Sequence, residues 1–94
     1  MSDAPQALAD LRREIDAIDA EMVGLLARRL GVVHRVLEVK QEHGIPALLP
    51  DRVEDVVARV TREATAQGVP EDLVEELWRR LIAWTVTYEE QRLG

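Results

Sequence analysis

The sequence contains no cysteine and no phenylalanine, and aromatic residues make up only 3% of its 94 residues. Without cysteine there are no disulfides, and His34 and His43 alone do not make a metal-ligand pattern. No apolar run approaches the length of about 18 residues that spans a membrane, and no charged segment followed by an apolar one indicates a leader peptide. We therefore expect a soluble, cytoplasmic protein with no metal site.

The chain also lacks an excess of positive charge, since its formal net charge is -6. Nucleic acids and acidic membranes are bound by basic surfaces, so neither is an expected partner. Hydrophobic residues make up 47% and charged residues 32%, and the abundance of Ala, Leu, Val, Glu and Arg predicts an all-α fold with almost no strand. We expect one domain, residues 1–94, small enough to gain stability from a second copy.

A long first helix is predicted over about residues 6–43, where no proline occurs. Its apolar residues recur at alternating steps of three and four, which is typical of a helix that packs against another helix. At about 1.5 Å per residue such a helix is roughly 50 Å long, too long for a compact monomer of this size. The series comprises Leu8, Leu11, Ile15, Ile18, Met22 and Leu25, and its continuation to positions 29, 32, 36 and 39 places Arg29 on the apolar seam and Lys40 at its edge.

Glycine and proline divide the rest of the chain. Residues 42–50 contain Gly44, Pro46 and Pro50 and predict a break. A second helix is predicted over about 51–67, ending before Gly68, and a third over about 71–92. The expected order is long helix, short helix, medium helix.

The cations of the first helix raise a geometric question. Arg29 and Lys40 are eleven residues apart, which is about 20° around a helix and about 16 Å along it, so both side chains could bracket one small anion. Arg12 lies about 26 Å before Arg29 and could join such a site only from an antiparallel partner chain. The alternative is that the cations keep their charge in water or pair locally with Glu38 or Glu42.

A second pair of polar residues lies near the C-terminus. Thr85 and Glu89 are four residues apart and share one face of the third helix. The alternative is a solvated acidic helix end. Neither a Ser/His/Asp or Cys/His arrangement nor a glycine-rich phosphate loop is evident.

The stretch "LADLRREIDAIDAEMVGLLARRLGVVHRVLEVK" resembles the first helix of the all-helical (AroQ-type) chorismate mutase family. The resemblance continues through "PDRV" to the third helix, and the register of Arg12, Arg29 and Lys40 matches the family without a gap. It implies an intertwined all-α homodimer in which the long first helices pack antiparallel. Each of the two sites would use Arg12 of the other chain.

The resemblance also implies roles for individual residues. Arg29 resembles the arginine that binds one carboxylate region of the substrate, and Lys40 the lysine between a carboxylate and the enolpyruvyl ether oxygen. Glu89 stands at the position of the Gln or Glu that faces this oxygen. The remaining implied substrate-binding positions are Arg12, Arg52, Leu49, Val53 and Thr85.

The implied reaction is the Claisen rearrangement of chorismate to prephenate, or that of the 4-amino-4-deoxy analogue. It needs no cofactor and no covalent intermediate, because the enzyme holds a flexible dianion in its reactive conformer and stabilises charge on the ether oxygen. Glu89 can donate to that oxygen only when protonated, so we expect activity to fall as the pH rises and this proton is lost.

Leu49 and Val53 depart from the resemblance, because many chorismate mutases have Asp and Glu there to contact the ring hydroxyl. The apolar "PALLPDRV" resembles instead the isochorismate pyruvate lyases and the 4-amino-4-deoxychorismate mutases. An isochorismate pyruvate lyase giving salicylate and pyruvate is therefore an alternative. A non-catalytic helical dimer or regulatory subunit is another, although it would be expected to lose at least one of the cations.

Overall fold

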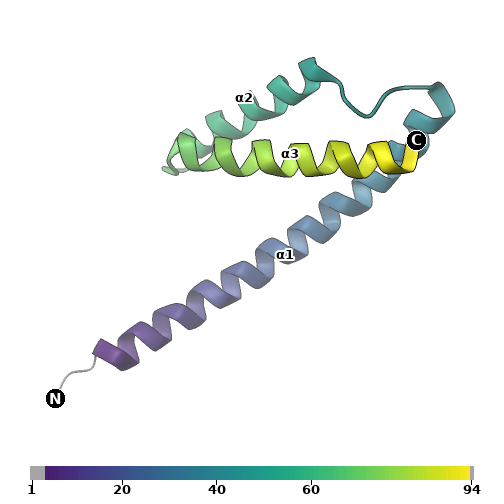
Figure 1. Cartoon of the computed structure of the whole chain (residues 1–94). Coiled ribbons are helices and arrows are strands. Elements are labelled where there is room, and N and C mark those ends of the chain that lie inside the picture. The colour runs from purple at the N-terminus through teal and green to yellow at the C-terminus, as the bar shows by residue number, and fades with distance from the viewer. Residues whose placement is uncertain (1–3, 94) are drawn as a thin grey trace. The chain divides into compact units, whose positions relative to one another are not determined.

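The computed structural model describes residues 4–93, and their regular structure is entirely helical. Three helices follow one another, α1 (Ala4–His43), α2 (Pro50–Ala66) and α3 (Glu71–Leu93) (Figure 1). The prediction of an all-α chain with a long, a short and a medium helix is confirmed, and every helix end lies within two residues of the one expected. None of the described helices is both long and apolar enough to cross a membrane.

The chain divides within α1 into two compact units, one ending at Arg35 and the other beginning at Val36. The expectation that residues 1–94 form a single domain stays a prediction. The described part of the first unit is a single stretch of helix. Its apolar side chains are uncovered in this chain. Between 47% and 65% of the surface is exposed at the members of the series, Leu8, Leu11, Ile15, Ile18, Met22 and Leu25, and at the neighbouring Val23 and Leu26.

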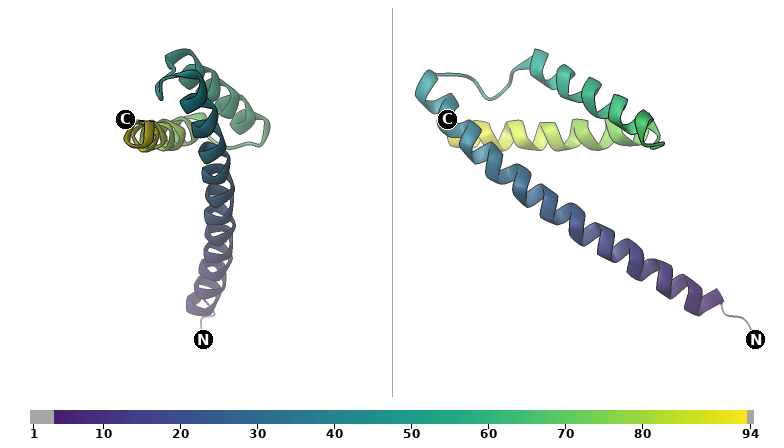
Figure 2. Two further views of the ribbon diagram at one scale, coloured as in Figure 1. Left: turned by 90° about the vertical axis from the view of Figure 1, so that its right-hand side faces the viewer. Right: turned by 180° about the vertical axis from the view of Figure 1, so that it is seen from behind.

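The second unit contains the end of α1, the connecting loop, and an antiparallel hairpin of α2 and α3 (Figure 2). Val57 and Ala64 of α2 are buried, as is Leu37 near the end of α1. Val57 and Ala64 are seven residues apart and so lie on one face of their helix. Burial in this unit also includes two polar side chains, Thr85 and Glu89 of α3.

Two glycines end the first two helices in the same way. Gly44 has φ of 64° and Gly68 has φ of 73°, in the left-handed region that glycine enters without a steric penalty. The residue after each glycine donates its backbone N–H to a carbonyl oxygen in the last helical turn. Ile45 donates to Lys40 at 2.9 Å, and Val69 donates to Ala64 at 2.8 Å. Both are Schellman caps, the usual glycine-dependent end of a helix.

Proline sets the start of α2. The helix begins at Pro50, whose fixed φ suits the first turn and whose missing N–H needs no partner there, and Asp51 follows in the same turn. The irregular segment between α1 and α2 is therefore residues 44–49, inside the break predicted for 42–50. This short loop carries Ala47, Leu48 and Leu49 to the start of α2.

Candidate active site

A buried ion pair joins the end of α1 to α3. The Lys40 Nζ donates to the Glu89 Oε1 at 2.8 Å, and their side chains are only 11% and 8% exposed. The same Nζ donates to the carbonyl oxygen of Ala47 in the loop, at 2.9 Å. The alternatives in which Lys40 keeps its charge in water and Glu89 belongs to a solvated helix end are therefore wrong for this chain.

The pair is better explained by chemistry than by stability. Removing two charges from water costs several kcal/mol per ion in proteins, about as much as their attraction returns, so buried pairs add little net stability. A cation held in a nearly dry place acts strongly on any charge that develops beside it, because water screens it little. Lys40 is also the only lysine in the sequence.

Thr85 lies one turn before Glu89 on α3 and is buried. Its Oγ1 donates to the carbonyl oxygen of Leu81 at 2.8 Å, a backbone bond within the helix. The predicted common face of Thr85 and Glu89 is present, and both side chains are buried. The substrate-binding role of Thr85 stays a prediction.

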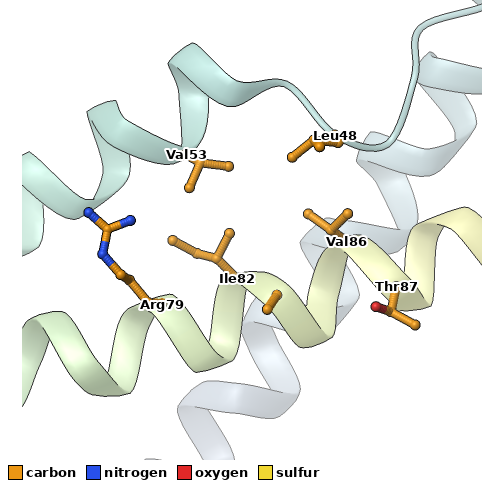
Figure 3. Close-up of a pocket in the computed structure, with 7 residues that line it drawn as sticks. Leu48, Val53, Arg79, Ile82, Val86 and Thr87 are labelled. Carbon is orange, nitrogen blue, oxygen red and sulfur yellow. The ribbon is translucent and has the colours of Figure 1, made fainter.

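An open apolar hollow of about 350 Å³ lies between the hairpin helices. Val53 and Leu48 on one side face Ile82 and Val86 of α3 on the other (Figure 3). Arg79, Ala83 and Thr87 complete its lining. Val53, one of the predicted positions, thus contributes a hydrocarbon wall.

Leu49 does not line this hollow. It is the N-cap residue of α2, in an extended conformation, and 36% of its surface is exposed. A leucine side chain cannot accept a hydrogen bond from the free N–H groups of the first turn. The predicted role of Leu49 beside the substrate ring stays a prediction.

Arg52 is bound on the surface of α2. Its Nη1 donates to the Asp55 Oδ2 at 2.7 Å, and the Arg59 Nε donates to the same oxygen at 3.1 Å. Hydrogen bonds from Arg59 and then Arg52 hold the pKa of the Asp55 carboxyl below its usual value. The Arg52 side chain is 63% exposed, and it is not among the hydrogen-bond partners of Lys40, which are Ala47 and Glu89.

A second arginine, Arg79, was not among the residues predicted from the sequence. Its Nη1 and Nη2 donate to both oxygens of Glu54 at 3.1 and 3.0 Å, which bridges α3 to α2, and its Nε donates to Glu75 at 3.4 Å. The hydrogen bond and the charge of Arg79 lower the pKa of Glu54. The spacing of Glu75 and Arg79 is readable from sequence, whereas the bridge to Glu54 depends on tertiary packing.

Arg12 and Arg29 belong to the first unit. Arg12 is exposed and Arg29 is half-buried. Their predicted roles toward a substrate carboxylate stay predictions. Among residues 4–93, no group of three His, Cys, Asp or Glu side chains is arranged to hold a metal ion.

The sequence of the chain was compared with known protein families. The chain belongs to the family described as chorismate mutase type II, whose family model matches residues 11–90. The matched region includes both members of the buried ion pair.

Three curated relatives that are similar to this chain carry three different names. It is 40% identical over 85 residues to the T-protein of Enterobacter agglomerans, covering 90% of this chain but 23% of that protein. It is 33% identical over 75 residues to the 4-amino-4-deoxychorismate mutase of Streptomyces venezuelae, covering 80% of this chain and 73% of that one. With the isochorismate pyruvate lyase of Pseudomonas aeruginosa it shares 36% identity over 80 residues, 84% of this chain and 77% of that one. No solved structure matches the chain significantly.

Proposed function

We propose that this chain is a cytoplasmic isomerase of the chorismate mutase type, which rearranges chorismate to prephenate or acts in the same way on 4-amino-4-deoxychorismate. The observation that carries the proposal is the buried Lys40–Glu89 pair, a cation and a carboxyl group 2.8 Å apart. Family membership adds the reaction class, because the matched family is named for this activity.

The reaction needs little from the protein beyond position and charge. In the substrate the ether C–O bond breaks while a new C–C bond forms, and no group passes to the enzyme. Negative charge grows on the ether oxygen as that bond breaks, and Lys40 is the donor that we assign to it. When Glu89 carries a proton it adds a second donor through one carboxyl oxygen, while the other oxygen can still accept the hydrogen bond from Lys40.

The anionic ends of the substrate need cations. We assign the carboxylates to Arg29 and to the partner's Arg12, and we give Arg52 and Thr85 the remaining polar substrate-binding roles. For Arg52 this requires that it exchange Asp55 for a ligand carboxylate. Exposed ion pairs of this kind contribute little to stability, so this exchange costs little free energy.

The apolar wall at Val53 supports a second candidate. A hydrocarbon side chain there cannot accept a hydrogen bond from a hydroxyl group on the substrate ring. The named relatives include a pyruvate lyase as well as a 4-amino-4-deoxychorismate mutase. An isochorismate pyruvate lyase, releasing salicylate and pyruvate, is therefore the alternative activity.

One experiment separates these activities. Purified protein is incubated in parallel with chorismate, isochorismate and 4-amino-4-deoxychorismate, and products are identified by mass and absorbance. Prephenate or its amino analogue supports the mutase proposal, whereas salicylate with pyruvate supports the lyase. If the protein converts none of the three substrates, the enzymatic proposal is overturned and the non-catalytic helical dimer remains.

We further propose a homodimer with antiparallel first helices. The uncovered apolar series from Leu8 to Leu25 supports it, because a sustained heptad stripe on a helix needs a partner to be buried. Each site would take Lys40 from one chain and Arg12 from the other.

Mixing two inactive variants tests this sharing. In a heterodimer of an Arg12→Ala chain and a Lys40→Ala chain, one site would regain both cations and the other would have neither. Activity should then partly return. No recovery from verified heterodimers would remove the assignment of Arg12 to the partner's site.

A further inference from the structure

Lys40 is bound to the loop after α1 through both its backbone and its side chain. Its carbonyl oxygen accepts the Ile45 N–H at 2.9 Å, which closes the Schellman cap. Its Nζ donates to the carbonyl oxygen of Ala47, also at 2.9 Å. Between these two bonds the chain reverses at Gly44, with φ of 64°. The position of the Ala47 carbonyl therefore depends on the left-handed conformation of Gly44.

The Lys40 ammonium group has three N–H donors in a tetrahedral arrangement. One is used by Ala47 and one by Glu89, and the described residues provide no third partner. Two fixed directions determine the third, whereas a single bond to Glu89 would let the group rotate about it. The Ala47 carbonyl is also neutral, so it orients the ammonium group without cancelling its charge.

We propose that Gly44 is a positioning residue for the reaction, because its left-handed backbone places the Ala47 carbonyl that aims the third N–H of Lys40. The inference rests on the proposed function in one respect, namely that this third donor meets the substrate's ether oxygen. Orientation of this kind affects the transition state more than the binding of the substrate, since the charge on the oxygen develops only as the bond breaks.

The chain contains a matched control for this proposal. Gly68 has the same handedness, with φ of 73°, and the same cap, with the Val69 N–H bonded to the Ala64 carbonyl. A Cβ atom added at either glycine would meet nothing within 4 Å. Alanine therefore introduces the same kind of backbone strain at both positions, but only the cap at Gly44 leads to Lys40.

The experiment compares Gly44→Ala with Gly68→Ala and adds Gly44→Asn, since asparagine tolerates the left-handed region. Kinetic constants are measured with the substrate that the wild-type protein converts, beside thermal unfolding. We expect similar losses of thermal stability in the two alanine variants. Only Gly44→Ala should lower kcat, by about 10- to 100-fold, as for a misplacement near 1 Å, with KM changed less than about twofold. Gly44→Asn should restore most of kcat.

A second readout does not depend on turnover. Because Lys40 is the only lysine, labelling with ¹⁵N-lysine gives one side-chain ammonium signal in the ligand-free protein. A held, nearly buried ammonium group should give a slowly exchanging signal in the wild type, in Gly68→Ala and in Gly44→Asn. The signal should broaden or disappear in Gly44→Ala.

The outcomes separate the two proposals. If the wild type converts none of the three substrates, the proposed function fails, and the ammonium signal alone decides whether Gly44 positions Lys40. Equal kcat values for the two alanine variants, a change confined to KM, or an ammonium signal unaffected by Gly44→Ala would each overturn the positioning role.

Discussion

Residues 4–35 and residues 36–93 use apolar side chains in opposite ways. In the first region, Val33 is the only large apolar residue that is buried, and the heptad positions from Leu8 to Leu25 are each about half exposed. In the second region, Leu37, Val57 and Ala64 are buried, and the polar Thr85 and Glu89 are buried with them.

The difference shows what each region contributes. The second region has the packing that excludes water, and it is there that a lysine and a glutamate are held with little exposure. The first region has a regular apolar pattern, but most of its apolar side chains are exposed in this chain. They are therefore available to another chain. Changes to the buried side chains of the second region should therefore alter chemistry directly, and changes to the exposed apolar side chains of the first should act through association.

The largest effect is expected for Lys40→Ala. Loss of one donor to a developing oxyanion costs about 3–4 kcal/mol, which lowers the rate by a factor of several hundred. The measurement is kcat with the accepted substrate, and Arg80→Ala, which removes an exposed cation from α3, is the control.

The double variant Lys40→Met/Glu89→Gln leaves no unpaired buried charge, so it should fold and still be inactive. Activity near that of the wild type in either Lys40 variant would contradict the assignment.

A smaller effect should follow when the seam of the first region is interrupted. If a second chain covers the seam, Ile15→Asp removes about 1.5–3 kcal/mol of hydrophobic stabilisation per chain and places a charge in the interface. Sedimentation should then show dissociation to monomers. Val23→Asp is the control, because both side chains are largely exposed in the single chain, at 56% and 65%, but Val23 lies off the heptad seam. Equal behaviour of the two variants would argue that the seam is not an interface.

A gain of stability is expected from Gly24→Ala in the middle of α1. Alanine favours the helix over glycine by about 0.5–1 kcal/mol, and nothing in this chain lies within 4 Å of the added Cβ atom. Because residues 4–35 have almost no core, helix propensity should count for more there than in the hairpin. Chemical denaturation measures the change. A loss of stability would instead indicate that another chain packs closely on this glycine.

The smallest effect concerns the bridge between α2 and α3. Since Arg79 lowers the pKa of Glu54 below the ordinary 4.5, the bridge stabilises the fold at neutral pH. That contribution is lost as the pH falls through the lowered value in the folded protein. Glu54→Gln should therefore unfold slightly earlier than the wild type near neutral pH, and the difference should shrink in acid. Glu76→Gln, on the same hairpin, should show no such trend, and a difference independent of pH would exclude the bridge as its cause.

The helices could be predicted because their limits depend on local chemistry. Gly44, Pro50 and Gly68 end or begin helices for reasons that lie in their own backbones. The 3–4 apolar spacing likewise predicted a helix with one face reserved for a partner, and that face is uncovered here.

The geometry of the candidate site could be predicted only in part. Lys40 and Glu89 were each expected in a site, but their direct contact joins residues 49 positions apart and depends on how α3 packs. The bond from Lys40 to the Ala47 carbonyl has no signature in side-chain identity, because any residue supplies a carbonyl. The pairing of Arg52 with Asp55 was readable as an i,i+3 pair, yet its competition with a substrate carboxylate becomes evident only in the folded chain.

The uncovered seam has a consequence for how the protein behaves on dilution. If a second copy covers it, folding and association are linked by mass action, so apparent stability rises with protein concentration. Dilution toward the dissociation constant would then lower the melting temperature and the activity per chain together. Chain concentration thus becomes a control on a reaction that is itself unimolecular in its substrate.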